Sequence, residues 1–180
     1  FNTIFLVIKI QIWYIDNVQR DRRKLYMPNW ITNTIKMRGN GETIKTIFNR
    51  HFANGTFDFN TITPQPQTIK ECPEEYICDC KKQHLEPEDG KPWFNWYNWN
   101  CDNWGVKWNA CEGWVDTELN MFGFETPWCV PGAVLAKMSR LYPNIVFEIE
   151  VTGEIDQPYR LHVQNGKEIF YEEFEENWED

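Results

Sequence analysis

The sequence predicts an α+β sandwich, in which one antiparallel sheet carries two helices on a single face. Two kinds of hydrophobic spacing support this class. Apolar residues alternate over residues 30–38 and 145–152, as they do in strands that bury one face, and they recur every three or four residues over 44–52 and 134–142, as in amphipathic helices. A third observation is an Asn-Gly pair between two apolar runs near the C-terminus, which is a strong signal of a β-hairpin.

The first strand is predicted over residues 30–38. Four of its residues are expected to face the core, because they alternate with polar ones: Ile31, Asn33, Ile35 and Met37. A turn at Gly39-Asn40-Gly41 separates this strand from a helix, and Asn54-Gly55 is expected to end that helix. The apolar stripe of the helix consists of Ile44, Ile47, Phe48 and Phe52.

A long insertion is expected after the first helix, over about residues 53–104. Residues 53–92 are polar and hold five of the ten prolines, and Thr63-Pro64-Gln65-Pro66 is incompatible with regular structure. The last part of the insertion has aromatic residues at helical spacing, which predicts a short helix before Gly105. The residues with this spacing are Trp93, Trp96, Tyr97, Asn100 and Trp104.

Two strands, a helix and a fourth strand are predicted after the insertion. The two strands span residues 107–116 and 118–126, and the helix begins at Pro131, because proline is favoured at the first helical position. The fourth strand covers residues 145–152, and the hairpin that follows it turns at Asn165-Gly166.

The order of these elements is the split β-α-β pattern of ferredoxin-like sandwiches. In that arrangement the strand order is 4-1-3-2, and both helices cover one face of the antiparallel sheet. We therefore expect a single ferredoxin-like domain over residues 27–174, with its insertion at about 53–104, a C-terminal hairpin, and an acidic tail at 175–180.

Residues 1–26 show no clean period and are interpreted as a non-native extension, translated from an upstream region. Arg22-Arg23-Lys24 can be encoded by a purine-rich ribosome-binding sequence, and Met27 then follows as the start codon. A signal peptide and a strand with a charged tail are the alternatives, although the positive region and the cleavage site of a signal peptide are missing. Without this segment the formal net charge changes from −9 to −12.

The composition excludes several classes of protein. No stretch of about 18 uninterrupted apolar residues is present, which excludes a polytopic membrane protein. The sequence pI of about 4.9 argues against binding of nucleic acid through broad charge neutralisation. Without a secretory signal, the six cysteines are expected to be reduced thiols in a cytoplasmic protein. No cofactor is predicted.

Three short motifs resemble a known family: MPNW at residues 27–30, NWGVKWNA at 103–110 and FETPWCVP at 124–131. Together they are similar to motifs of the YubB-type ferredoxin-like domains that phages, plasmids and gut bacteria carry. Two positions depart from the family pattern, Ile31 after the first motif and Cys129-Val130-Pro131 in the third. The resemblance spans Met27 to about Tyr171 and implies the fold and a mobile-element context, but no chemistry, because the family has no established activity.

The motifs are expected to meet at one edge of the sheet, where the first and second strands begin and the third ends. The candidate binding residues there are Asn29, Trp30, Asn103, Trp104, Lys107, Trp108, Thr126 and Trp128. Two interpretations compete: aromatic side chains that plug the end of the core, and a pocket for a partner with a polar rim. We expect Trp30 and Trp108 to be buried, and Trp104 or Trp128 to be partly exposed.

Cysteine and histidine residues give no clear site. A zinc ion would need four ligands, and the one group that could supply them is Cys72, Cys78, Cys80 and His84. Its spacing fits no standard knuckle, so no metal site is predicted. No nucleophile forms a recognisable pattern with His51, His84 or His162, and no phosphate loop or dinucleotide fingerprint occurs. No catalytic residue is therefore predicted.

The function predicted from these observations is that of a non-enzymatic accessory protein of a mobile element, which acts by binding a host or element-encoded protein. One alternative is a nucleic-acid-binding domain that stacks bases on its sheet, with Lys36 and Arg38 as its nearest basic residues. A second is an acidic mimic of nucleic acid, which the net charge motivates. A third is an uncharacterised enzyme that uses Cys129 or Lys107.

Overall fold

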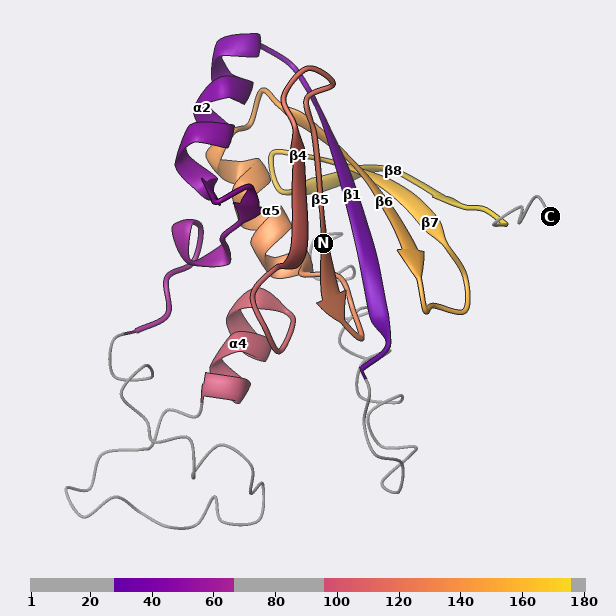
Figure 1. The fold of residues 1–180 in the computed structure, drawn as a ribbon. Helices are drawn as coiled ribbons and strands as arrows, with labels where there is room; N and C mark the ends of the chain where they lie inside the picture. Colours follow the sequence, from indigo (N-terminus) through magenta and orange to yellow (C-terminus); the bar gives the residue numbers. More distant parts are fainter. Residues whose placement is uncertain (1–27, 67–95, 176–180) are drawn as a thin grey trace, which may run out of the picture.

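The computed structural model describes residues 28–66 and 96–175. In these residues a twisted six-stranded sheet has the strand order β4-β5-β1-β6-β7-β8, and every neighbouring pair is antiparallel (Figure 1). The strands are β1 (Trp30–Arg38), β4 (Cys111–Asp116), β5 (Met121–Pro127), β6 (Val146–Gly153), β7 (Tyr159–Gln164) and β8 (Lys167–Glu173). The predicted α+β class with an antiparallel sheet is therefore confirmed.

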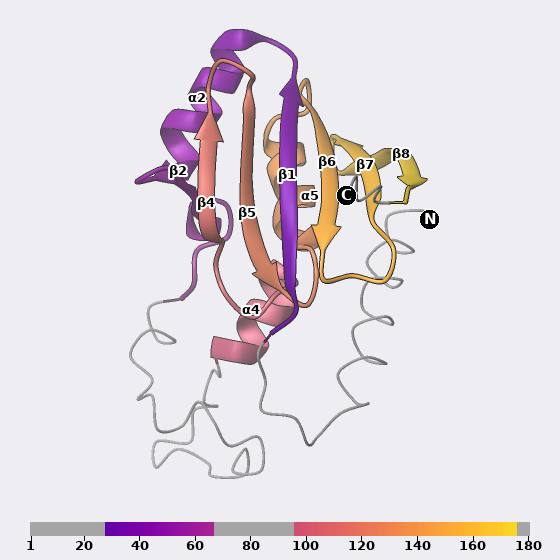
Figure 2. The same cartoon turned by 45° about the vertical axis from the view of Figure 1, so that its right-hand side comes forward.

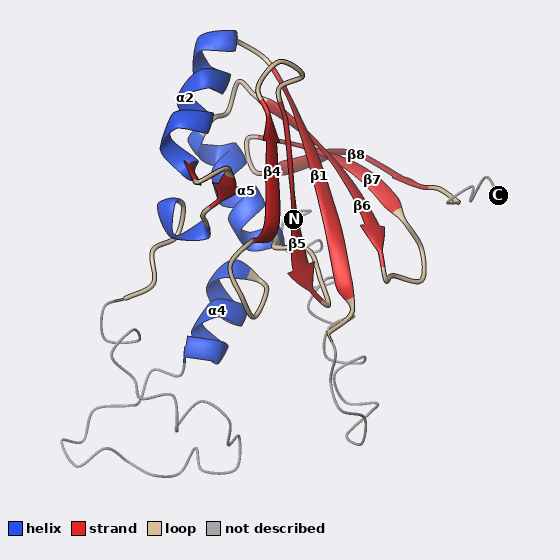
Figure 3. Cartoon of the chain, in the orientation of Figure 1, coloured by secondary structure: helices blue, strands red, loops and turns tan. Residues whose placement is uncertain are grey.

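Helices cover one face of the sheet. α2 (Gly41–His51) and α5 (Gly132–Leu141) both lie on this face, and Figure 2 shows them behind the strands. A third helix, α4 (Trp96–Trp104), contacts α5 and lies at the end of the sheet where β1 begins and β5 ends (Figure 3). We call the other side of the sheet the open face, since no described helix covers it.

β1 is paired on both sides, with β5 and with β6. Its four predicted core residues are all buried, and the residues between them point to the open face. Asn40 then starts α2 by accepting the Thr43 N–H on its side-chain oxygen at 3.1 Å, which satisfies one of the free donors at the helix N-terminus. Local signals and the hydrophobic pattern agree here, and this part of the prediction is confirmed.

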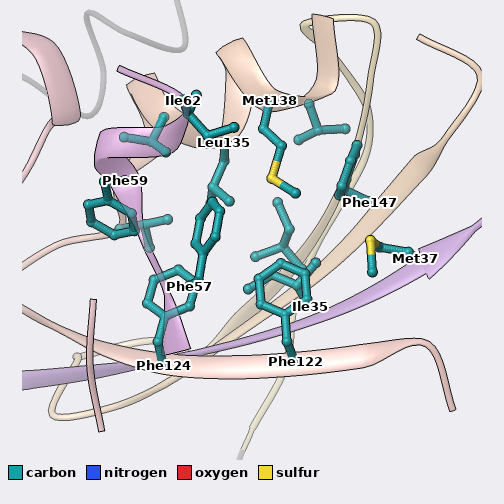
Figure 4. Packing of buried hydrophobic residues seen from close by; sticks show 14 of the residues in the cluster. Ile35, Met37, Phe57, Phe59, Ile62, Phe122, Phe124, Leu135, Met138 and Phe147 are labelled. Atoms are coloured by element: carbon teal, nitrogen blue, oxygen red, sulfur yellow. The ribbon is translucent and has the colours of Figure 1, made fainter. Parts of the chain in front are cut away.

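The core is rich in aromatic residues, and part of it comes from the predicted insertion. Phe122 and Phe124 of β5 point from the sheet towards α5 (Figure 4). Phe57 and Phe59, which follow α2, pack against them with ring centroids 5.5 to 5.6 Å apart, and their own centroids are 5.4 Å apart. Burying large rings in this way removes much apolar area from water, so residues 56–62 are an integral part of the domain.

Asn54-Gly55 does not end the first helix, so that prediction is wrong. α2 ends at His51, and two short strands follow, β2 (Phe52–Ala53) and β3 (Thr56–Phe57). Asn54 and Gly55 form the turn between them, with φ angles of 51° and 80°. Positive φ at both central residues is what a tight hairpin turn requires, and Asn-Gly supplies it at low cost.

The second predicted strand begins later than expected. β4 starts at Cys111, and residues 105–110, which include Trp108, form a loop. The pairing with β5 shifts register between Cys111 and Trp114, and Glu112 has a φ of 44°. This irregularity turns Trp114 to the open face, where 42% of it is exposed and its ring covers Gly123.

Other boundaries differ by a few residues. β5 starts at Met121, because Asp116 Oδ1 accepts the N–H groups of Glu118 and Leu119 and holds residues 117–120 in a turn. Pro131 is the N-cap of α5 rather than its first helical residue. These shifts leave the order of the elements unchanged.

The C-terminal hairpin is confirmed. Asn165 and Gly166 have φ angles of 49° and 71°, and they join β7 to β8. The Gly166 N–H donates to Ser139 Oγ at 2.7 Å, which ties the turn to α5. Every residue of β8 is exposed, so this edge strand adds little to the core. In the described residues, no helix is long and apolar enough to cross a membrane.

Candidate functional site

Three tryptophan rings and one lysine meet where β1 begins and β5 ends. The ring centroids of Trp30 and Trp108 are 6.1 Å apart, and those of Trp108 and Trp128 are 6.2 Å apart. Lys107 Nζ lies 4.4 Å from the Trp108 centroid and 5.6 Å from the Trp128 centroid. We call these four residues the tryptophan edge. All four are partly exposed, so the group forms part of the protein surface.

Trp30 is held in place by the segment that follows β6. Its backbone N–H donates to Glu154 Oε2 at 2.9 Å, and its carbonyl accepts the Glu154 N–H at 2.9 Å. Asn29, which is exposed, donates its side-chain amide to the Glu154 carbonyl at 3.5 Å. These bonds fix the start of β1, and they place a carboxylate beside Trp30.

Lys107 is positioned by the end of α4. Gly105 ends this helix with a φ of 84°, and its N–H donates to the Cys101 carbonyl at 3.1 Å. Val106 is fully buried, and the buried side chain of Asn100 donates to the Lys107 carbonyl at 2.7 Å. The backbone at Lys107 is therefore anchored to the core.

Trp108 is fixed from its other side by Asn109. The Asn109 side-chain oxygen accepts the Phe59 N–H at 2.9 Å, and its amide donates to Asp58 Oδ1 at 2.7 Å. Asn109 thus ties the loop at residues 105–110 to Asp58 and to Phe59, the first residue of the short 3-10 helix Phe59–Thr61. Because both ends of the loop are bonded, its exposed side chains project from a rigid base.

Trp128 lies in the turn after β5 and has a φ of 64°. Positive φ is unusual for a bulky residue and costs about 1–3 kcal/mol. Hydrogen bonds hold the turn in this form: the Trp128 N–H donates to the Asn29 carbonyl at 2.8 Å, and the Thr126 hydroxyl donates to the Cys129 carbonyl at 2.8 Å. The ring of Trp128 is therefore kept beside Trp108 at a cost in backbone strain.

A buried polar pair lies beneath the tryptophan edge. Asn33 of β1 donates its side-chain amide to Thr126 Oγ1 at 2.9 Å and to the Ile31 carbonyl at 3.1 Å. Both Asn33 and Thr126 are fully buried. Thr126 was predicted as a candidate binding residue, but it is buried and cannot contact a partner at the surface. Its hydroxyl instead links β1 to the turn that contains Trp128.

Several expectations about the site residues need correction. Trp30 and Trp108 are partly exposed rather than buried, because both belong to the surface cluster. Trp104 is only 2% exposed: its ring packs against Phe59 and its indole N–H donates to the Thr63 carbonyl at 2.8 Å. It is a core residue, whereas Trp128 is partly exposed as expected.

Asn103 lies on α4 and donates to the Trp99 carbonyl of its own helix at 2.9 Å. Another residue of this helix, which was not predicted as a site residue, does reach the tryptophan edge. The ring centroid of Tyr97 lies 5.8 Å from Lys107 Nζ. No sequence signal could have revealed this contact, because it depends on how α4 is placed against the sheet.

A second polar cluster lies at the far end of α2. His51 is 5% exposed, its Nδ1 lies 2.8 Å from Thr61 Oγ1, and its Nε2 lies 2.7 Å from the Tyr142 hydroxyl. The Thr61 hydroxyl donates to the Asp58 carbonyl at 2.6 Å, so it accepts the proton of His51 Nδ1. Nε2 of the neutral ring then accepts the Tyr142 proton. His51, Thr61 and Tyr142 line a hollow of about 380 Å³ together with Arg50 and Leu141.

His51 acts here as a connector between three elements. Burial, with Arg50 nearby as the smaller cause, lowers the pKa of His51 below its ordinary value of 6.5. A neutral ring with both nitrogens already hydrogen-bonded links α2, the 3-10 helix and the residue after α5. This group could not be predicted from the sequence, because His51, Thr61 and Tyr142 belong to three different segments that only the fold brings together.

The proposed nucleophile Cys129 is not activated. Burial, with Cys101 nearby as the smaller cause, raises its pKa to about 12, so the thiol stays protonated at neutral pH. Among the described residues, no group of three or more His, Cys, Asp or Glu side chains is placed to hold a metal ion. Cys72, Cys78, Cys80 and His84 lie outside the described residues.

The open face of the sheet offers little positive charge. Arg38 pairs with Glu148 on the neighbouring strand, N to O 2.6 Å, and Arg160 pairs with Glu150, also at 2.6 Å. The outward residues of the central strand β1 between Trp30 and Arg38 are Thr32, Thr34 and Lys36, and none of them is aromatic. A surface that stacks bases needs rings on its central strands together with several free cations. Between Trp30 and Arg38, the open face of β1 offers one cation, Lys36, and no ring.

Comparisons with family models, with curated proteins and with solved structures found no match to this chain. The interpretation of the site therefore depends on its own geometry.

Proposed function

We propose that the chain is a ferredoxin-like protein that acts without catalysis, by binding another protein through the tryptophan edge. The strand order β6-β1-β5-β4, with two helices on one face, supports this fold type. The motif resemblance described above supports a role as an accessory factor of a phage or plasmid. Its partner is then a host or element-encoded protein, and its compartment is the cytoplasm.

The observation that carries this proposal is a partly exposed cluster of tryptophan rings on a rigid base. Tryptophan is enriched among the residues that dominate binding energy at protein interfaces, where rings enter desolvated contacts. Trp30, Trp108 and Trp128 come from three separate segments, each hydrogen-bonded to the rest of the domain. A preformed surface of this kind loses little entropy on binding.

The backbone of Trp128 adds independent support. A purely structural role would be served by a relaxed residue, whereas Trp128 is kept at positive φ with its ring partly in solvent. Strained residues persist where the surrounding structure holds them, and they are frequent at binding sites.

The experiment compares capture by three forms of the protein. Immobilised wild type, Trp128→Ala and the control Trp114→Ala are incubated with lysate of the bacterial host at low and high salt, and bound proteins are identified by mass spectrometry. Trp114 is a suitable control because it is also exposed on the open face, but it covers Gly123 instead of joining the tryptophan edge.

We expect the wild type and Trp114→Ala to retain the same proteins, and Trp128→Ala to lose them at both salt concentrations. Ring contacts depend little on ionic strength, so the retained set should persist at high salt. Retention of the same set by Trp128→Ala would contradict the proposal. Capture of DNA-binding proteins that high salt releases would instead favour the acidic mimic.

A further inference from the structure

We infer that the tryptophan edge recognises a methylated lysine side chain of its protein partner, and that Lys107 occupies this site in the unbound protein. The inference rests on the proposed function, and it adds the chemical class of the group that is bound.

Three aromatic rings lie close to the Lys107 ammonium group. The rings of Trp108, Trp128 and Tyr97 have centroids at 4.4, 5.6 and 5.8 Å from the nitrogen. Each distance is within the range of about 6 Å in which a ring face attracts a cation. Trp30 packs against Trp108, with ring centroids 6.1 Å apart, and extends the aromatic surface. The rings come from α4, from the loop at residues 105–110 and from the turn after β5, so three separate segments contribute rings around one nitrogen.

The contacts of Lys107 indicate which cation the site prefers. In the described part of the chain its ammonium group faces rings and takes part in no ion pair. An ordinary ammonium carries three N–H donors and is strongly hydrated, and ring faces replace that hydration poorly. A methylated ammonium keeps its charge, has fewer donors or none, and is the group that aromatic cages bind best.

The charge of the protein favours the same ligand. The chain carries a net charge of −9, so a cationic segment is attracted towards it. Glu154, whose carboxylate accepts the Trp30 N–H, lies beside the site and adds negative charge there. An anionic partner segment would be repelled both by the net negative charge of the chain and by the Glu154 carboxylate.

Lys107 acts as an internal competitor. Its side chain has a flexible four-carbon stem, so it can leave the rings without any change in the backbone, which Asn100 fixes. If a ligand binds only after Lys107 has left the rings, its apparent affinity is its intrinsic affinity multiplied by the fraction of protein molecules in which the site is empty. Replacing Lys107 by a neutral residue should therefore strengthen binding.

The test follows the tryptophan indole N–H signals by NMR during titration with acetylated trimethyl-lysine amide and with choline. The neutral control is 3,3-dimethyl-1-butanol, which has the shape of choline with carbon in place of the charged nitrogen. Wild type, Lys107→Gln, Trp128→Ala and the control Trp114→Ala are titrated in parallel, and circular dichroism verifies that each variant is folded.

We expect saturable shifts of the same indole signals with both cations and none with the neutral analogue. Lys107→Gln should bind on the order of tenfold more tightly than the wild type, Trp114→Ala should match the wild type, and Trp128→Ala should lose binding. Trimethyl-lysine amide should bind at least as tightly as choline, and a clear preference for choline would overturn the assignment to a protein side chain.

Equal shifts with the neutral analogue, or no saturable shift in either the wild type or Lys107→Gln, would overturn the inference. The capture experiment distinguishes an absence of specific cation binding from a failure of the proposed function. If Trp128→Ala still loses its captured proteins while neither cation binds, the edge is a protein-binding site with a different ligand class.

Discussion

Trp128 joins a bulky side chain to a backbone conformation that favours glycine, with a φ of 64°. Trp128→Gly and Trp128→Ala both remove the ring, but only glycine relaxes the backbone. We therefore expect the glycine variant to be more stable than the alanine variant by about 1–2 kcal/mol, the cost of the left-handed region for a residue with Cβ. Urea unfolding of the two variants measures this difference. Equal free energies of unfolding would show that the turn is not strained.

His51 gives the stability of the protein a pH dependence. Its pKa in the fold lies below the ordinary 6.5, so the unfolded chain binds more protons in the window between the two values. The contribution of His51 to stability is therefore complete above about pH 7 and decreases as the pH falls through 6.5.

The matched control for this effect is His51→Gln, which removes the titrating group. We expect the free energy of unfolding of the wild type to fall more steeply between pH 7.5 and pH 5 than that of the variant. Other ionisable groups contribute equally to both proteins, so the difference between the two curves isolates His51. Parallel curves would contradict the connector role of a neutral, buried ring.

At the scale of elements, the loop at residues 105–110 depends on one side chain. Asn109 bonds the Phe59 N–H and the Asp58 carboxylate, and its loss leaves partly buried groups without these partners. We expect Asn109→Ala to lower the free energy of unfolding by about 1–3 kcal/mol. It should also weaken capture by the tryptophan edge, because Trp108 loses its support.

Asn103→Ala is the control for this prediction. Asn103 bonds a carbonyl within its own helix, and its substitution should change stability by less than about 0.5 kcal/mol, as at an ordinary surface position. Thermal unfolding of both variants gives the comparison. If Asn109→Ala is no more harmful than Asn103→Ala, the loop is held by other contacts.

The elements with a clean hydrophobic period were predictable from sequence. Alternation in β1 and the stripes in α2 and α5 depend on local spacing, and the structure confirms the alternation and most of each stripe. Two stripe positions were wrong: Phe52 lies in β2 after the end of α2, and Leu141 at the end of α5 is exposed. Asn54-Gly55 was misread because the same pair that can follow a helix also forms hairpin turns. Here it joins β2 to β3, which pair with each other and bring Phe57 into the core. The start of β4 was misplaced because Trp108 continues an alternating pattern although it lies in a loop.

The candidate site was predictable only in its location. The strand order brings the starts of β1 and β4 and the end of β5 together, which explains why Trp30, Trp108 and Trp128 meet. Burial of Trp104 could not be predicted, since it follows from the packing of α4 against Phe59. The contact of Tyr97 with Lys107 has the same tertiary origin.

For the whole molecule, the described core starts at β1, which pairs with strands on both sides. We expect removal of residues 1–26 to leave the free energy of unfolding unchanged within about 0.5 kcal/mol, because the hydrophobic pattern begins at Trp30. Urea unfolding of the full chain and of the shortened chain tests this. A loss of several kcal/mol in the shortened chain would show that the segment contributes to the fold.

The central claim is that the tryptophan edge is the surface through which the protein binds its partner. Oxidative footprinting with mass spectrometry, applied to the free protein and to the captured complex, tests it most directly. In the free protein, Trp30, Trp108 and Trp128 should be oxidised at intermediate rates, between the exposed Trp114 and the buried Trp104. In the complex these three should become protected, since bound rings lose contact with solvent. Unchanged oxidation of all three in a complex that protects other surfaces would contradict the claim.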